Sequence, residues 1–89
     1  MEFEWDDTKR AANLAKHGLD LLDGQALFDG RPGYIYSSPR SGEERFVTVG
    51  LLDDEFFALV WTERGAAARL ISLRRARNGE KRAYRALFG

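Results

Sequence analysis

The chain of 89 residues contains no cysteine, one histidine, one methionine and two prolines. Without cysteine it can form neither disulfides nor thiolate metal sites, which favours a reducing compartment. Long apolar runs are also missing, because the longest, FFALVW at residues 56–61, is far too short to span a bilayer. The acidic start, MEFEWDDTKR, lacks the hydrophobic core of a secretory signal. We therefore expect a cytoplasmic protein with no part in a membrane.

An excess of charge of one sign is missing too, since 14 basic residues balance 14 acidic ones. The balance hides an asymmetry: residues 1–30 carry three basic and seven acidic residues, whereas residues 69–89 carry seven basic and one acidic. A basic C-terminal segment is typical of a protein with an anionic partner, either nucleic acid or an acidic protein surface. A solvated helix face has the same composition. The length fits one domain over residues 1–89.

The N-terminal third predicts a short strand and two helices. MEFEW alternates aromatic and charged residues, as a strand with one solvated face does. Asp6 or Asp7 can cap the helix that follows, and Gly18 can end it in the left-handed conformation. Asp20 can cap a second helix, which Gly30 and Pro32 would stop. Its apolar residues are Leu21, Leu22, Ala26 and Phe28.

The rest of the chain holds four short apolar runs, YIYSS, RFVTVGLL, EFFALVWTE and AARLISLR, and then returns to helical spacing in NGEKRAYRALF. Runs separated by turn residues predict an antiparallel meander, and Asn78 is the expected cap of the last helix. Since strands follow one another, the fold class is α+β. We expect a small, mainly antiparallel sheet of four to five strands, with two N-terminal helices on one face and a C-terminal helix. The predicted strands cover residues 1–5, 34–37, 45–52, 55–63 and 67–75.

Seven short motifs occur in the order and spacing of one known family. They are FEWD at 3–6, N..KHG at 13–18, EER at 43–45, VG at 49–50, TERG at 62–65, RLISLRRA at 69–76 and E..AY at 80–84. With them the chain resembles the BrnT toxins of type II toxin–antitoxin pairs over nearly its whole length. The resemblance implies a RelE-like ribonuclease fold and RNA cleavage that inhibits translation and growth. It also implies neutralisation by a ribbon-helix-helix antitoxin of the BrnA type, in a heterotetramer that binds operator DNA only through the antitoxin.

RNA cleavage without a metal requires removal of the 2′-hydroxyl proton, stabilisation of the leaving oxygen, and cations at the phosphate. The sequence has no metal-ligand spacing, since it has one histidine, no cysteine and no HxH or DxD signature. We therefore expect a metal-independent reaction with no cofactor. The catalytic candidates, chosen by their positions in the motifs, are His17, Glu44, Arg64 and Arg74.

Each catalytic candidate also has a purely structural interpretation. His17 titrates near neutral pH, but a histidine before a helix-ending glycine can simply favour the helix dipole. Glu44 is a candidate base or a holder of an arginine, yet charges at a strand entry also protect sheet edges. Arg64 is a candidate phosphate clamp in a turn, where arginines are often merely exposed. Tyr84 lies on the apolar face of the last helix and is expected in the protein core.

Arg74 lies at the end of an apolar strand, where a guanidinium suits bidentate phosphate binding. Because side chains alternate along a strand, we expect Arg74 to share its face with Leu70 and Ser72. Replacing Arg74 by alanine is expected to abolish toxicity and to leave the folded state largely intact. The remaining candidates for RNA binding are Lys16, Arg45, Arg75, Arg77, Lys81 and Arg82.

Two functions remain open at this point. The first is a metal-free endoribonuclease toxin. The second is a non-enzymatic binding module that acts with its antitoxin in operator DNA binding and autoregulation. The basic residues serve either function, so incubation of the purified protein with RNA and a chelator is the experiment that separates them.

Overall fold

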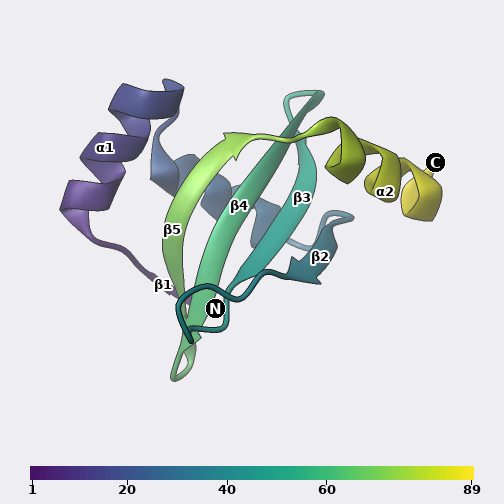
Figure 1. Ribbon diagram of the computed structural model, residues 1–89. Helices are drawn as coiled ribbons and strands as arrows, with labels where there is room; N and C mark the ends of the chain where they lie inside the picture. The colour runs from purple at the N-terminus through teal and green to yellow at the C-terminus, as the bar shows by residue number, and fades with distance from the viewer.

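The computed structural model describes residues 1–89 and contains three helical segments and five strands. Figure 1 shows most of them labelled along the chain. In chain order they are β1 (Glu2–Glu4), α1 (Asp7–His17), the 3₁₀ helix η1 (Leu21–Phe28), β2 (Tyr34–Ser37), β3 (Phe46–Leu52), β4 (Glu55–Arg64), β5 (Ala67–Arg75) and α2 (Asn78–Phe88). The α+β class and all five predicted strands are confirmed, each within a residue or two of its expected ends.

The five strands form one sheet in the order β1-β5-β4-β3-β2. The three pairs from β2 to β5 are antiparallel, as a meander requires, but β1 runs parallel to β5. The sheet is therefore mixed, and the expectation of a mainly antiparallel sheet needs this correction. The reason is that β1 and β5 are distant in the chain, so turn signals between neighbouring runs carry no information about their pairing.

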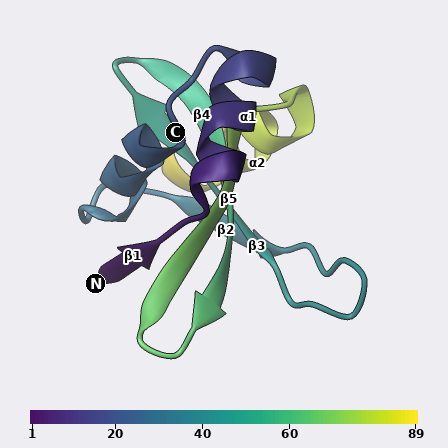
Figure 2. The ribbon, with the colours of Figure 1, turned by 90° about the vertical axis from the view of Figure 1, so that its left-hand side faces the viewer.

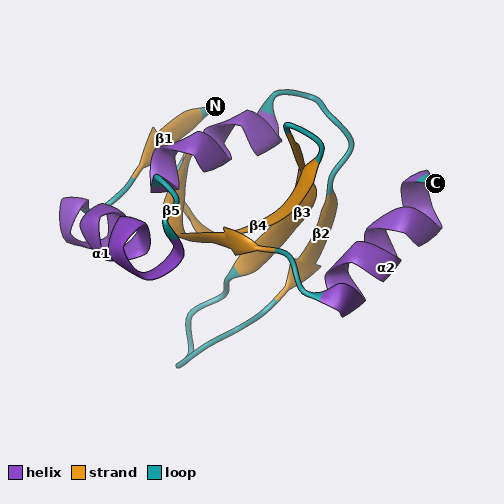
Figure 3. Cartoon of the chain, turned by 90° about the horizontal axis from the view of Figure 1, so that it is seen from above, coloured by secondary structure: helices purple, strands orange, loops and turns teal.

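The sheet is strongly curved, and the 3₁₀ helix η1 covers its concave side (Figure 3). Leu21 and Leu27 of η1 lie in a buried cluster with Leu59 and Trp61 of β4. Gly24 permits this close packing, because a Cβ there would lie 2.7 Å from Cδ1 of Leu59. The expectation was that two N-terminal helices cover one face, and it needs modification. The second of them, η1, is a 3₁₀ helix on the concave face, whereas α1 lies beside β5 at the edge of the sheet.

Helix α2 packs on the opposite face of the sheet. Tyr84 lies in a second buried cluster with Val47, Val49 and Ala58, which confirms its expected place in the core. The predicted cap at Asn78 is wrong, because the helix is capped at Arg77, whose N–H donates to the Glu80 carboxylate. The other predicted helix ends are correct, since Asp6 and Asp20 cap their helices and Gly18 has a φ of 68°. No helix is both long and apolar enough to cross a bilayer.

A β-bulge in β5 changes which side chains share a face. The pairing with β4 shifts between Val60 and Trp61, so Ile71 is an extra residue between Leu70 and Ser72. Leu70 is consequently buried in the cluster under η1, while Ser72 and Arg74 face the other side of the sheet. The expectation that Arg74 shares its face with Leu70 is therefore wrong, and only Ser72 accompanies it.

Asn13 is the only buried residue of α1, and it joins this helix to the sheet. Strand β1 covers the edge of β5 only as far as Arg69. Beyond that point the Asn13 side chain takes the place of a neighbouring strand: its Oδ1 accepts the N–H of Leu73 at 2.9 Å, and its Nδ2 donates to the Leu73 carbonyl at 3.0 Å. The same Nδ2 donates to the Leu19 carbonyl. Asn13 therefore fixes the C-terminal half of α1 beside the end of β5.

Replacing Asn13 by alanine is expected to lower the free energy of unfolding by about 2 kcal/mol, because it leaves the buried N–H of Leu73 without a partner. Urea denaturation measures this loss. The neighbouring exposed Leu14→Ala variant is the control and should lose much less. Equal midpoints for the two variants would contradict the role assigned to Asn13.

Candidate active site

A groove of about 440 Å³ lies where the end of α1, the β2–β3 loop and the end of β5 meet. Six of its twelve lining residues are basic and none is acidic. The basic residues are Lys16, His17, Arg40, Arg45, Arg74 and Arg77. The others are Tyr36, Ser38, Val47, Val60, Ile71 and Ser72. Five of the ten residues that the sequence singled out are therefore brought together from distant parts of the chain.

Lys16 and His17 reach the groove because they are the last two residues of α1. Lys16 is exposed and His17 is half-buried. Their place next to the end of β5 follows from the bonds of Asn13 to Leu73, which hold this end of the helix. His17 thus both ends a helix and lines the groove, so its two interpretations from the sequence are compatible.

Arg40 is supplied by the loop between β2 and β3, which extends away from the sheet in Figure 2. The loop is closed by a tight turn: the backbones of Arg40 and Glu43 exchange two hydrogen bonds of 2.9 Å, around Ser41 and Gly42 in left-handed conformations. Arg45 follows and pairs with Glu43 at 2.9 Å. Arg40 was not among the candidates from the sequence, although the Ser-Gly pair after it is a turn signal.

Arg74 is held by a carboxylate from behind. Its Nη1 and Nη2 donate to the two oxygens of Glu80 at 2.8 and 2.9 Å, and the side chains of this pair are only 15% and 7% exposed. Glu80 also accepts hydrogen bonds from the Tyr36 hydroxyl and the Arg77 N–H. Because a guanidinium has five N–H donors, the Nε–H of Arg74 remains available. Neither Glu80 nor Tyr36 was a site candidate, although Glu80 begins the E..AY motif.

The hydrogen bonds of this network shift the protonation of its members. Burial alone would raise the pKa of Glu80, but the bonds from Arg74, the Arg77 N–H and Tyr36 outweigh it and lower this pKa to about 2. The bond to Glu80 raises the pKa of Arg74. Burial, and then the neighbouring Glu80, raise the pKa of Tyr36. At neutral pH the network therefore consists of a charged arginine, a charged carboxylate and a neutral phenol.

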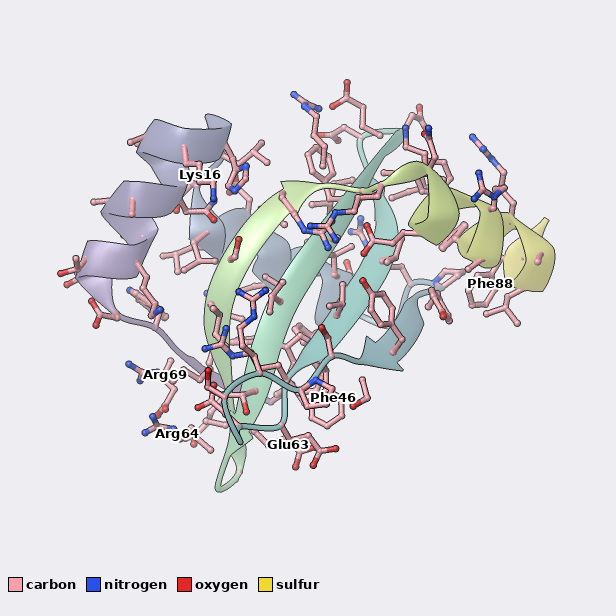
Figure 4. All side chains as sticks on the ribbon, viewed as in Figure 1. Lys16, Phe46, Glu63, Arg64, Arg69 and Phe88 are labelled. Carbon is pink, nitrogen blue, oxygen red and sulfur yellow. The ribbon has the colours of Figure 1, made fainter.

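Glu44 and Arg64 do not lie in the groove. They line a separate hollow with Glu43, Phe46, Thr62 and Glu63. Figure 4 shows Arg64 and Lys16 at opposite ends of the molecule, so Arg64 and Arg74 do not hold one phosphate between them.

Three further candidates also lie elsewhere. Arg75 is exposed, pairs with Glu55 at 2.9 Å and lies over the Phe57 ring. Lys81 and Arg82 are on α2 and do not line the groove. No group of three or more histidine, aspartate or glutamate side chains is arranged to hold a metal ion.

The comparison with protein families gives one match, over residues 5–80. The matching family is described as the ribonuclease toxin, BrnT, of type II toxin–antitoxin systems. The chain belongs to the BrnT family. The match begins directly after β1 and covers α1, η1, the other four strands of the sheet, and the first residues of α2 as far as Glu80. A search of curated proteins gives no match.

Membership in the BrnT family confirms the resemblance found in the sequence and identifies the chain as a toxin with ribonuclease activity and an antitoxin partner. A ribonuclease must bind the anionic backbone of RNA, and the groove has the matching charge.

Proposed function

We propose that this BrnT toxin is a metal-independent endoribonuclease whose active site is the groove between α1 and β5. The observation that carries the proposal is the gathering of six basic side chains, with no acidic one, around a single hollow. Such a groove attracts the phosphates of a single RNA strand and stabilises the charge that develops on a phosphate during cleavage. Inhibition of translation and growth follows from the loss of RNA.

The reaction needs only groups that the groove contains. The 2′-hydroxyl oxygen attacks the adjacent phosphorus, its proton passes to a base, and the bond to the 5′ oxygen of the next nucleotide breaks as that oxygen gains a proton. The products are a 2′,3′-cyclic phosphate and a free 5′-hydroxyl. We assign the proton transfer to His17, because one nitrogen of a neutral imidazole accepts a proton while the other donates one. The Nε–H of Arg74, with Lys16, Arg40 and Arg45, stabilises the phosphate.

We further propose a BrnA-type ribbon-helix-helix antitoxin as the partner, with two toxins and two antitoxins in the complex. Operator DNA is then bound through the antitoxin alone. Light scattering on the complex purified with the product of the adjacent gene tests this stoichiometry.

Cleavage of RNA in the presence of a chelator tests the central proposal. The purified toxin should cleave single-stranded RNA equally well with EDTA and with Mg²⁺, and the products should carry cyclic phosphate ends. Activity that is lost in EDTA and restored by Mg²⁺ would contradict metal independence. A toxin that binds its antitoxin but cleaves no RNA under either condition would instead be a binding module.

His17→Ala is expected to slow cleavage by about 10²- to 10⁴-fold, the usual contribution of a positioned acid or base. The loss of the favourable histidine at the helix end should cost less than about 1 kcal/mol of stability. His17→Lys is the matched control, because it keeps a cation at the helix end and removes the imidazole. If His17 serves only the helix, the lysine variant will cleave RNA at the wild-type rate.

A further inference from the structure

A second hollow, of about 390 Å³, adjoins the groove between β2 and the start of α2. It is lined by Tyr34, Tyr36, Arg77, Gly79, Glu80 and Ala83. Tyr36 and Arg77 belong to both hollows and form the boundary between them. An RNA strand that lies along the basic groove therefore reaches this hollow directly beyond Arg77.

The side of the second hollow that β2 forms is aromatic. Because side chains alternate along β2, Tyr34 and Tyr36 project to one face and Ile35 to the other. The two tyrosine rings lie 5.6 Å apart with an angle of 30° between their planes. The Tyr34 ring is half-buried, and its hydroxyl makes no hydrogen bond within the chain. Tyr34 therefore offers a ring face for stacking and a free polar group beside it.

The carboxylate in this hollow does not repel an electron-rich ligand. Glu80 Oε1 accepts from Arg74 Nη1 and the Arg77 N–H, and Oε2 accepts from Arg74 Nη2 and the Tyr36 hydroxyl. The bonds occupy about as many positions as a carboxylate offers. Its charge is balanced by Arg74, so the hollow presents rings, small residues and the Arg77 side chain to a ligand.

We infer that the second hollow receives an unstacked RNA base, next to the phosphate that Arg74 holds. This inference rests on the proposed function, in which the groove binds the RNA backbone. Proteins bind single-stranded RNA by combining a basic groove with aromatic rings on which bases stack. Here the two parts are continuous, since Tyr36 and Arg77 line both. The hollow is the place where the toxin contacts a base and so gains a preference among RNA sites.

The test uses short fluorescent RNA strands with 2′-O-methyl sugars, which bind but cannot be cleaved at the modified positions. One abasic position is moved along the strand, and affinity is measured by anisotropy. At one position the missing base should weaken binding to the wild-type protein about tenfold, because a stacked base contributes that much or more. Tyr34→Leu should bind the intact strand about tenfold more weakly and show no further loss at that abasic position.

Two variants complete the design. Tyr34→Phe keeps the ring and should behave as the wild type, whereas Ile35→Ala, on the same strand and the opposite face, should leave RNA affinity unchanged. Melting temperatures identify any variant that fails to fold, and the abasic scan on the wild-type protein needs no variant at all.

The possible failures are distinguishable. If groove variants weaken RNA binding but no abasic position is coupled to Tyr34, the base site is wrong and the groove remains. If Tyr34→Leu releases the antitoxin and leaves RNA affinity unchanged, the hollow belongs to the protein partner and the inference is overturned. If the wild-type protein binds no RNA, both the base site and the proposed function fail.

Discussion

Replacing Lys16 and Arg40 together by alanine is expected to slow RNA cleavage at least about 10²-fold, the usual loss when donors to developing charge are removed. Both side chains line the groove, both are exposed, and neither belongs to an ion pair within the chain. Their charges are thus available to RNA phosphates, and their removal breaks no internal contact. The melting temperature should therefore stay close to that of the wild type.

The salt dependence of RNA affinity measures the loss of the same phosphate contacts without any need for cleavage. Each phosphate contact of a single strand contributes about 0.7 to the slope of log affinity against log salt concentration. Removal of two contacts should lower this slope by about 1.4. Anisotropy titrations with uncleavable RNA at several salt concentrations measure it directly.

The matched control is Lys9→Ala with Arg64→Ala, which removes two positive charges from exposed positions outside the groove. It should retain the cleavage rate and the salt slope of the wild type. The control also tests Arg64, which the sequence favoured as a phosphate clamp. Equal losses in the two double variants would show that overall charge, and not the groove, governs RNA binding.

The parts of the fold that could be predicted are those set by local pattern. The alternation in MEFEW located β1, and short apolar runs between turn residues located the other four strands. Capping residues located the starts of α1 and η1. The parallel pairing of β1 with β5 and the bulge at Ile71 depend on residues far apart in the chain. A periodic pattern along the chain reveals neither the parallel pairing nor the bulge. Leu70 and Arg74 were therefore assigned to one face of the sheet, although they lie on opposite faces.

Of the candidate site, the sequence predicted some of the basic residues but not the residues that hold them. Sequence position brought Lys16, His17 and Arg74 forward, and the groove does contain them. Arg64 lies outside the groove because it ends β4 at the turn into β5, whereas Arg74 lies near the other end of β5. Tyr36 and Glu80 were missed because a tyrosine in a strand and a glutamate in a first helical turn have ordinary structural roles. Only their contact with each other and with Arg74 distinguishes them.

Arg74→Ala is expected to lower the free energy of unfolding by about 3–4 kcal/mol, in addition to its effect on cleavage. The pair that it breaks is nearly buried, with the Glu80 side chain only 7% exposed. Removing one partner of a buried pair leaves the other charge uncompensated, which typically costs 3–5 kcal/mol. The expectation from the sequence, that this variant leaves the fold intact, is revised by the position of Glu80 behind the guanidinium.

The loss should depend on pH in a defined direction. The pKa of Glu80 is lowered from 4.5 to about 2 in the folded chain. A carboxyl with a lowered pKa stabilises the folded state fully above about pH 4.5, and this contribution disappears as the pH falls towards 2. At about 1.4 kcal/mol for each pKa unit, it amounts to about 3 kcal/mol. The stability gap between the wild type and Arg74→Ala should therefore be widest at neutral pH and narrow at pH 3.

Urea denaturation at pH 7, 4 and 3 measures this gap, and Arg75→Ala is the matched control. Arg75 is the next residue of β5, but its pair with Glu55 is exposed, with side chains 64% and 60% accessible, so its loss should cost under about 1 kcal/mol. Equal losses for the two variants, or a gap that does not change with pH, would contradict the role given to Glu80. Because Arg74→Ala loses stability as well as a phosphate donor, its cleavage rate has to be compared at equal folded fraction. Arg74→Lys keeps the charge but not the fork that spans both oxygens of Glu80, so it should recover little of either loss.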